Sequence, residues 1–560
     1  MTKTATFVLA LALNLLATLP AAAGPFQDPA IDAVFSEYDR RDSPGCALGV
    51  IRDGEFTYRR GYGMANLEHD IPITTGSVFR IGSTSKQFTA TAVVLLAGSG
   101  KLSLDDPVRK FFPEFPAWAD AMTVRQLLHH TSGIRDYLEL AFLAGKEDDA
   151  DYYTDRWVLD LLSRQRETNF PPGERFLYSN SGYLLAAHIV KRVSGQSLRE
   201  YAAAHIFGPL GMTHTHFHDD HTHIVPGRAA GYAPAGTGYR ISMTTLDMVG
   251  DGGVFTTIDD LLQWDRNFYD NRLGQGGALI RQLTTPGTLN DGEVLDYGLG
   301  LGIETYRGLP MIAHGGAFVG YRAELIRFPQ QRFSVAVLCN RSDANPSTLA
   351  RQVADHALTE LMSAPERPAA TSPESEPWKP SAGELAEFSG DFWEPELGFA
   401  AETRIEAGEL WAVHSPERRN RLEFVAPDTF RMMDVPGDVF VLFDRDDSGA
   451  IVRMRRTIDG EARGEFTPFQ RRQASAGELA AYAGDYYSEE LDVAYPLRIN
   501  ESRLTFRAPQ HEAQELTAMF GETFENPDYG AFEFERDETG GITGFTLQSG
   551  RVRNLFFARR

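Results

Sequence analysis

Cysteine and positive charge are both scarce in this sequence. Only 2 of its 560 residues are cysteine, which excludes a disulfide-rich scaffold and a zinc site built from four thiolates. Lysine and arginine together number 54, against 77 aspartate and glutamate residues, and the formal net charge is therefore −23. A chain this acidic is not expected to bind nucleic acid, and it has no electrostatic attraction to anionic membranes.

Sequence motifs of several large enzyme classes are absent as well. The chain has no G-x-S-x-G motif, which argues against an α/β-hydrolase. It also lacks the glycine-rich motifs G-x-x-x-x-G-K-[ST] and G-x-G-x-x-G, which hold phosphate groups. We expect no cofactor and no catalytic metal.

A long apolar run occurs only at the N-terminus, where it is typical of a secretory signal peptide. Lys3 provides the positive charge, Phe7–Leu19 is too short to span a bilayer, and Ala21–Ala23 offers small residues for cleavage before Gly24. We expect residues 1–23 to be removed and the mature protein to be secreted and periplasmic, with no membrane span. The alternative, an uncleaved membrane anchor, lacks the stop-transfer flank that should follow it.

An exported protein can form disulfides. Cys46 begins one apolar run, Cys46–Ile51, and Cys339 ends another, Phe333–Cys339. The two thiols can meet if these runs are antiparallel neighbours in a sheet. Two buried free thiols are the alternative.

Composition divides the mature chain into a longer first part and a shorter second part. Residues 363–380 contain five prolines and almost no apolar side chains, a composition typical of a linker. An internal repeat follows: SAGELAEFSGDFWEPEL begins at Ser381 and SAGELAAYAGDYYSEEL at Ser475, and both copies continue in short alternating runs separated by turn signals. We predict a first domain at 24–362 and two small antiparallel all-β, lipocalin-like barrel domains at 381–472 and 475–560.

The first part mixes strand and helix patterns. Strand patterns occur early and late, at Ala47–Ile51, Glu55–Tyr58, Met311–His314, Tyr321–Phe328 and Phe333–Cys339. Helical patterns lie between them, at Ser83–Ala97, Val124–His130, Trp157–Gln165 and Ser181–Val193. Strands at both ends with helices between them predict one α/β domain whose sheet uses both ends of the chain.

Three short motifs in this domain point to catalysis, and the first is Ser83-Thr84-Ser85-Lys86 at an expected helix start. Ser83 and Lys86 lie three residues apart and therefore face the same side of a helix. A serine hydroxyl needs a base within hydrogen-bond reach to act as a nucleophile, and a desolvated lysine can lose its proton and serve. A capping serine beside a solvated lysine is the alternative interpretation.

The second motif is Tyr178-Ser179-Asn180, which precedes another helix. In a turn, Tyr178 and Asn180 can both point into one cleft. A tyrosine can carry a proton to a leaving group, and an asparagine amide can orient a substrate amide. The alternative is an ordinary helix N-cap with an aromatic contact.

The third motif is His314-Gly315-Gly316-Ala317 on a late strand. The two glycines let a substrate backbone approach closely. The N–H of Ala317 can join that of Ser83 in an oxyanion hole. The alternative is a strand end with a flexible turn.

Together, in this order, the three motifs resemble those of the β-lactamase-fold serine hydrolases, which include class C β-lactamases, DD-carboxypeptidases, D-aminopeptidases and related esterases. The family's S-x-x-K, Y-x-N and H-x-G motifs match, and so does their context: VRQLLHHTSG at Val124–Gly133, GERFLYSNSGYLLAAHIVKRVSG at Gly173–Gly195 and FGPLGMTHT at Phe207–Thr215. The resemblance covers residues 26–360. It implies an α/β (α+β) transpeptidase-like domain, with an antiparallel sheet flanked by helices, an all-helical subdomain and the site between them.

The resemblance also implies roles for single residues. Ser83 is the nucleophile, Lys86 and Tyr178 share the proton transfers, and which of the two is the acylation base stays open. Asn180 orients the substrate, and Gly315, Gly316 and Ala317 line its binding strand.

His314 is the departure from the penicillin-targeted and class C members, which have lysine there in K-T-G. An unperturbed histidine is mostly neutral at pH 7, so binding of a free substrate carboxylate should be weaker. Gly315 also removes the hydroxyl of the family's threonine. Both changes favour an aminopeptidase, an esterase or another acyl hydrolase over a β-lactamase.

The two C-terminal barrels make the overall architecture resemble the D-aminopeptidases. In those enzymes a loop of the last domain enters the cleft and helps to select a substrate with a free N-terminal amine. A comparable loop is expected between Gln510 and Tyr529, which is rich in aspartate and glutamate. An acidic surface is the alternative interpretation of that segment.

The sequence thus predicts an exported serine hydrolase that forms an acyl-enzyme on Ser83 and cleaves small peptides or amides with an N-terminal D-amino acid. The alternatives are a DD-carboxypeptidase-like or β-lactamase-like hydrolase, a carboxylesterase, and a non-catalytic sensor of penicillin or peptidoglycan. Five histidines in HTHFHDDHTH (His214–His223) suit zinc or nickel. The segment is nevertheless expected to be a surface loop, and no metal site is predicted.

Overall fold

The computed structural model describes residues 28–148, 150–363, 380–395, 398–414, 419–433, 435, 439–458 and 461–560. The expected signal peptide (1–23) and all but the two end residues of the expected linker (363–380) lie outside the described residues, so both stay predictions. None of the helices in the described ranges combines the length and the apolar character that a bilayer-spanning helix requires.

Strands from both ends of the first domain form one antiparallel sheet, in the order β10-β11-β12-β13-β1-β2. The strands are β1 (Cys46–Arg52), β2 (Glu55–Tyr62), β10 (Gly302–Tyr306), β11 (Leu309–Phe318), β12 (Tyr321–Phe328) and β13 (Phe333–Cys339). The expectation that this sheet uses both ends of the domain is confirmed. Shorter strands lie around it: β3 (Met64–Asn66), β4 (Ile71–Pro72), β5 (Phe79–Arg80), β6 (His216–Phe217), β7 (Tyr232–Ala235), β8 (Gly238–Ile241) and β9 (Val254–Thr256).

The pairing of β1 with β13 decides between the two possibilities for the cysteines. Cys46 lies directly opposite Cys339, and the two form a disulfide across 293 residues of sequence. Both are fully buried in the layer between the sheet and the helices α1 (Pro29–Val34) and α11 (Pro346–Leu358). The bond therefore ties the two ends of the domain together.

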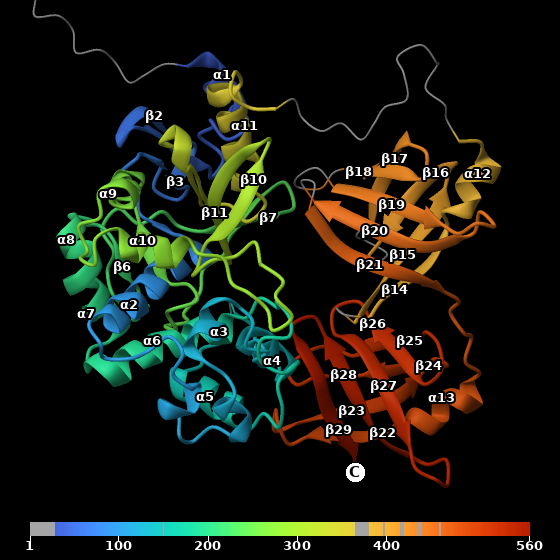
Figure 1. Cartoon of the computed structure of the whole chain (residues 1–560). Helices are drawn as coiled ribbons and strands as arrows, with labels where there is room; N and C mark the ends of the chain where they lie inside the picture. The colour runs from blue at the N-terminus through green and yellow to red at the C-terminus, as the bar shows by residue number, and fades with distance from the viewer. Residues whose placement is uncertain are drawn as a thin grey trace, which may run out of the picture.

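Helices cover the other face of the sheet and build the helical part of the domain (Figure 1). They are α2 (Lys86–Gly98), α3 (Val124–Leu128), α4 (Tyr137–Leu143), α5 (Asp155–Ser163), α6 (Asn180–Ser194), α7 (Leu198–Ala202), α8 (Gly208–Leu210), α9 (Ile258–Tyr269) and α10 (Gly277–Thr284). The two central helices, α2 and α6, are almost wholly buried, and they pack against each other. Ten of the thirteen residues of α2 are buried, because its apolar positions run around the whole helix rather than along one face.

The repeat forms two closed eight-stranded antiparallel barrels, which confirms the predicted fold class. The first has β14 (Gly390–Glu394), β15 (Phe399–Glu406), β16 (Glu409–Val413), β17 (Arg419–Ala426), β18 (Thr429–Met432), β19 (Val439–Arg445), β20 (Ile451–Ile458) and β21 (Glu461–Phe469). The second has β22 (Gly484–Ser488), β23 (Val493–Asn500), β24 (Arg503–Phe506), β25 (Gln514–Ala518), β26 (Thr523–Asn526), β27 (Gly530–Arg536), β28 (Ile542–Ser549) and β29 (Val552–Arg559). The domain boundaries given above remain predictions.

The SAGEL sequence that the two repeat copies share has a local structural cause. Each SAGEL segment begins a short helix, α12 (Ala382–Glu387) or α13 (Ala476–Tyr482), through a capping box. In each box the serine hydroxyl accepts from the backbone N–H of the glutamate three residues later, whose side chain accepts from the serine N–H. Both barrels are therefore preceded by a short helix with the same capping box.

The second barrel packs against the first domain beside α4, and the first barrel is stacked on the second (Figure 1). Two side chains carry much of this contact: the guanidinium of Arg135 binds the carboxylate of Glu490 at 2.6 Å, and both are almost wholly buried. Glu490 also accepts a hydrogen bond from the backbone N–H of Arg166 at 2.8 Å. On the other side of the contact the hydroxyl of Tyr495 donates to the carbonyl of Leu143 at 2.6 Å.

We expect Glu490→Gln to weaken this contact by about 3–5 kcal/mol, because it removes one charge of a buried pair and leaves Arg135 only the exposed carboxylate of Glu167 at 3.7 Å. Thermal unfolding and limited proteolysis between the domains would measure the change. Glu489→Gln is the matched control, since Glu489 pairs with Arg166 at an exposed position. Equal stability of the two variants would contradict the prediction.

Candidate active site

Ser83 lies in a tight turn that the chain makes between β5 and α2. The 3₁₀ turn Gly82–Ser85 leads directly into α2, whose first residue is Lys86. Gly82 has φ +50, and a Cβ there would lie 2.8 Å from the backbone nitrogen of Ala317. Glycine is therefore required at this position, and its absence of a side chain brings β11 against the turn that carries Ser83.

Lys86 lies fully buried beside Ser83. Its ammonium donates to Ser83 Oγ at 3.1 Å, to Asn180 Oδ1 at 2.9 Å and to the carbonyl of Asp251 at 2.7 Å. Burial lowers the pKa of Lys86 to about 7; the positive charge of Arg551 acts in the same direction, and the carboxylates of Asp251 and Asp136 oppose it. A substantial fraction of neutral amine is therefore available near neutral pH to accept the proton of Ser83.

Tyr178 completes the contacts around the serine. Its ring lies over the Lys86 nitrogen, 4.7 Å from the ring centre. Burial raises the pKa of Tyr178, and a hydrogen bond to Ser83 acts against that rise. At neutral pH the phenol therefore keeps its proton and can donate it, while the neighbouring lysine can accept one.

Asn180 is held in place by a buried carboxylate that the sequence analysis did not identify. Asp136, which is fully buried, accepts a hydrogen bond from the backbone N–H of Asn180 at 2.6 Å. Its other oxygen caps α4 by accepting from the N–H groups of Leu138 and Glu139. Nothing in the local sequence beyond an ordinary N-cap signal distinguishes Asp136.

Arg551 is the second functional candidate that the sequence analysis missed. It lies in the turn between β28 and β29 of the last barrel, and its guanidinium binds Asp136 at 3.1 Å and Glu139 at 2.7 Å. Its backbone carbonyl accepts from the side chain of Asn169 at 2.9 Å. The last barrel thus reaches the groups that surround Ser83 and Lys86 through one arginine.

The acidic segment Gln510–Tyr529 does not fill this role. Its carboxylates Glu515, Glu522 and Glu525 pair with arginines of the two barrels. The segment touches the first domain elsewhere, where the rings of His511 and Tyr529 pack on Phe142 at the end of α4. The part of the last barrel that reaches the groups around Ser83 is the β28–β29 turn, whereas these three carboxylates of the acidic segment pair within the barrels.

His314 is part of a buried hydrogen-bonded chain with Tyr297 and His130. His130 Nδ1 accepts from the N–H of Ser179, so its Nε2 carries the proton and donates to the Tyr297 hydroxyl at 3.3 Å. That hydroxyl in turn donates to His314 Nε2 at 2.9 Å, and His314 Nδ1 donates to the carbonyl of Gly315 at 2.6 Å. Burial, with the charge of Lys86, lowers the pKa of His314 to about 4, and the imidazole is therefore neutral.

Gly315 and Gly316 lie where β11 passes close to other atoms of the protein, and their expected part in the approach of substrate stays a prediction. A Cβ on Gly316 would lie 1.9 Å from the carbonyl oxygen of Ile81, and one on Gly315 would lie 2.9 Å from a carboxylate oxygen of Glu324. The close approach at Gly316 places the N–H of Ala317 near the Ser83 turn. Ser83 and Ala317 also line one small pocket together.

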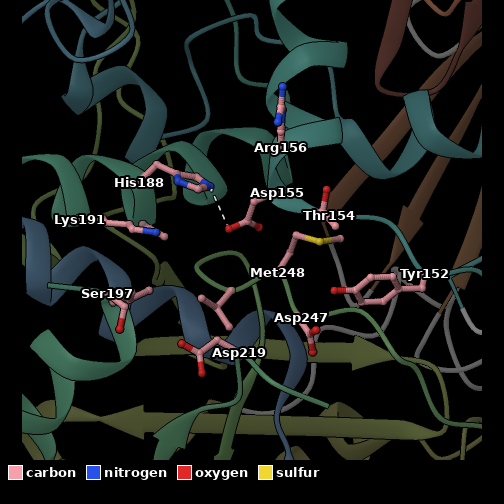
Figure 2. Close-up of a pocket in the computed structure, with 13 residues that line it drawn as sticks. Tyr152, Thr154, Asp155, Arg156, His188, Lys191, Ser197, Asp219, Asp247 and Met248 are labelled. Atoms are coloured by element: carbon pink, nitrogen blue, oxygen red, sulfur yellow. Dashed lines mark ion pairs between the residues drawn. The ribbon is translucent and has the colours of Figure 1, made fainter. Parts of the chain in front are cut away.

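A larger pocket, of about 340 Å³, shares Met248 with the smaller one and does not include Ser83 (Figure 2). Figure 2 shows the carboxylates of Asp155, Asp219 and Asp247 around it, with Asp155 paired to His188 at 3.4 Å. None of the groups that contact Ser83 lines this pocket. We therefore place the candidate chemistry in the smaller pocket.

The histidine-rich segment is only in part the surface loop that we expected: His214 and His223 are exposed, but the middle of the segment packs inward. His216 belongs to β6, and His218 is only 2% exposed, with its ring packed on Phe255. Burial lowers the pKa of both histidines, to about 4 for His216 and about 3 for His218. Within the described residues no group of three or more histidine, cysteine, aspartate or glutamate side chains is arranged to hold a metal ion.

We expect Gly316→Ala to destabilise the domain by about 1–3 kcal/mol or more, because the new methyl group meets backbone rather than a movable side chain. It should also slow covalent labelling of Ser83 by a fluorophosphonate, since β11 is pushed away from the serine turn. Gly238→Ala is the control, because a Cβ at Gly238 meets nothing within 4 Å. Thermal melting and labelling rates like those of the wild type would contradict this account of Gly316.

Comparison with known proteins agrees with this geometry. The family model described as Beta-lactamase matches residues 31–359. A D-aminopeptidase of Gluconobacter oxydans (strain 621H) is 30% identical over 459 residues, which cover 81% of each chain. The structure of the octameric penicillin-binding protein homologue from Pyrococcus abyssi is 25% identical, with a TM-score of 0.55 over 78% of this chain and 98% of that one. The D-amino acid amidase from Ochrobactrum anthropi SV3 shares the fold, with a TM-score of 0.51 at 23% identity over 59% of this chain and 99% of its own. The chain therefore belongs to the beta-lactamase family and is a serine hydrolase of that fold.

Proposed function

We propose that this protein is an exported aminopeptidase or amidase that acts on peptides and amides with an N-terminal D-amino acid, through an acyl-enzyme on Ser83. The observation that carries the mechanism is the fully buried ammonium of Lys86, 3.1 Å from Ser83 Oγ and without a carboxylate partner in the described part of the chain. The substrate class is supported by the D-aminopeptidase relatives, which match across both the catalytic domain and most of the barrels.

The opposite pKa directions of Lys86 and Tyr178 support one division of the proton transfers between them. Neutral Lys86 accepts the proton of Ser83 as the hydroxyl attacks the substrate carbonyl. Tyr178, which keeps its proton, donates to the leaving amine, and the lysine proton restores the phenol. The acyl-enzyme then forms with Ser83 bonded to the carbonyl carbon, and water completes the cycle by the same groups in reverse.

The remaining groups position the substrate and stabilise charge. Ser83 and Ala317 both line the small pocket, and we assign their backbone N–H groups to the oxyanion hole. Asn180, held by Asp136, presents its amide to the substrate. Neutral His314 offers no cation to a free carboxylate of the leaving group, which favours an aminopeptidase over a DD-carboxypeptidase or a β-lactamase.

Export is supported by two features. The N-terminal sequence has the organisation of a secretory signal. The Cys46–Cys339 disulfide requires an oxidising compartment such as the periplasm.

Steady-state hydrolysis of D-Ala and L-Ala p-nitroanilides tests the proposal directly. We expect turnover of the D form alone, and a loss of at least about 10³-fold in Ser83→Ala. Ser99→Ala, at the exposed end of α2, is the control and should match the wild type. Hydrolysis that persists in Ser83→Ala would exclude the mechanism, and turnover of the L form alone would exclude the stereochemistry.

The pH dependence tests the role of Lys86. With p-nitrophenyl acetate, whose charge does not change with pH, kcat/KM should rise with pH through a pKa near 7, because the neutral amine is the active form. Arg551→Gln removes a positive charge and leaves Asp136 unbalanced, and both changes raise the pKa of Lys86. The rise should therefore move up by about one pH unit.

Arg553→Gln is the control for that experiment, since Arg553 lies on the same hairpin and contacts the carbonyl of Pro395 instead. Its profile should coincide with that of the wild type. An unchanged profile in Arg551→Gln would mean that the rise reports a group other than Lys86.

A further inference from the structure

The small pocket beside Ser83 contains a charged residue that the mechanism above does not use. The pocket has a volume of about 60 Å³ and is lined by Arg80, Gly82, Ser83, Tyr137, Leu138, Asn180, Leu246, Met248, Asp251, Gly252, Ala317 and Phe318. Arg80 lies at the end of β5, three residues before the serine. Its position on that strand is fixed by pairing with Phe255 of β9.

Arg80 is a buried cation without an ion-pair partner in the described ranges: burial lowers its pKa, and the carboxylate of Asp251, the strongest charge acting against that fall, acts without forming an ion pair. Its side chain is 5% exposed, and its Nε has no hydrogen-bond partner. Across the described ranges no carboxylate lies within ion-pair distance of its guanidinium, which rests on the ring of Phe318 at 4.9 Å. Burying an unpaired charge costs several kcal/mol. A bound ligand of opposite charge would offset that cost.

The one carboxylate that lines the same pocket is already engaged. Asp251 Oδ2 accepts from the hydroxyl of Tyr137 at 3.0 Å. Its charge lies close enough to Lys86 for that ammonium to be the main influence lowering the pKa of Asp251, against the rise that burial causes. A second cation, Arg228, lies near Arg80 and adds to the positive potential. The pocket therefore has an unsatisfied preference for an anion.

The size and the position of the pocket narrow the choice of anion. A volume of about 60 Å³ is small beside the 340 Å³ of the larger pocket. It suits a small group such as a carboxylate on a short stem. Tyr178 and His314 do not line the pocket, whereas Ser83, Asn180 and Ala317 do. The pocket thus takes a group from the acyl side of the substrate rather than from the leaving group.

We propose that Arg80 is the specificity-determining residue of this pocket and that it binds the side-chain carboxylate of a short acidic acyl residue, of the aspartyl class. This inference rests on the proposed function for the D configuration and the free amine of the substrate. Arg80 presents a planar guanidinium, which suits a carboxylate held through two hydrogen bonds. The carboxylate of the substrate then forms the ion pair that Arg80 lacks in the folded protein.

The test compares two substrates that differ only in charge, the α-p-nitroanilides of D-aspartate and D-asparagine. We expect kcat/KM to favour the aspartyl compound by about tenfold or more in the wild type. Arg80→Gln should abolish or reverse that ratio, and Arg80→Lys should retain part of it. A wild-type ratio near one would overturn the inference.

Arg228→Gln is the matched control. Arg228 is also a partly buried arginine, stacked on Phe255 at 5.0 Å, but it does not line the pocket. Its aspartyl-to-asparaginyl ratio should fall by much less than in Arg80→Gln, because Arg228 adds to the positive potential but does not line the pocket. If the ratio fell as much as in Arg80→Gln, the preference would come from the overall positive potential of the site, and the specific role of Arg80 would be overturned.

A second measurement does not depend on the folding of any variant. The α-amides of D-aspartate and D-asparagine are compared as competitive inhibitors of the unmodified enzyme, and the acidic compound should bind about tenfold more tightly. Equal inhibition would contradict the inference. Failure of this inference can also be told apart from failure of the proposed function. If the D-Ala and D-Asn anilides are hydrolysed without a preference for D-Asp, the acidic specificity of the pocket is refuted and the proposed function stands.

If no D-aminoacyl compound is hydrolysed, the proposed function fails and the pocket is tested on simple esters. Mono-p-nitrophenyl succinate carries a carboxylate on a short acyl stem, and p-nitrophenyl butyrate is the neutral counterpart. A preference for the succinate that Arg80→Gln abolishes supports the pocket without any D-amino acid. Equal rates would overturn it.

Discussion

One buried carboxylate joins the two halves of this molecule at the place where its chemistry occurs. Asp136 caps α4, accepts the backbone N–H of Asn180 and pairs with Arg551 of the last barrel. Leaving a fully buried carboxylate without one of its partners costs several kcal/mol. Helix α4, helix α6 and the β28–β29 turn therefore hold one another, and the amide that contacts Lys86 is positioned as a result.

Burial sets the protonation states on which the proposed reaction depends. The pKa of Lys86 falls from 10.5 to about 7, which corresponds to about 5 kcal/mol less favourable protonation. The same burial keeps Tyr178 protonated and His314 neutral. A partly neutral amine and a neutral phenol thus lie beside Ser83, and a neutral imidazole lies near Tyr178.

The spacing of residues in the local sequence was sufficient to predict much of the site. The spacing of Ser83 and Lys86, three residues apart, predicts side chains that converge at a helix start. The spacing of Tyr178 and Asn180, which flank one residue, does the same in a turn. The structure brings these four residues together. The barrels were predictable for a related reason, because an internal repeat of short alternating runs leaves few other folds.

The contacts across long stretches of sequence were not predictable. Arg551 lies in a turn whose sequence is like that of many other turns, and only the docking of the barrel gives it a role. The acidic segment near Gln510 attracted attention through its composition, yet its charges are neutralised within the barrels. The cysteine pair shows the same limit, because a strand pattern does not reveal which strand becomes its neighbour or in which register.

The separation of Glu139 from Arg551 by 412 residues has a consequence during synthesis. At about 5–20 residues per second, a ribosome needs about 20–80 s to pass from the one to the other. During that interval the nascent chain already carries its serine and lysine, but Asp136 has no arginine beside it and α4 has no barrel against it. The last hairpin therefore completes the catalytic centre as a late step, after the domain that contains the nucleophile has left the ribosome.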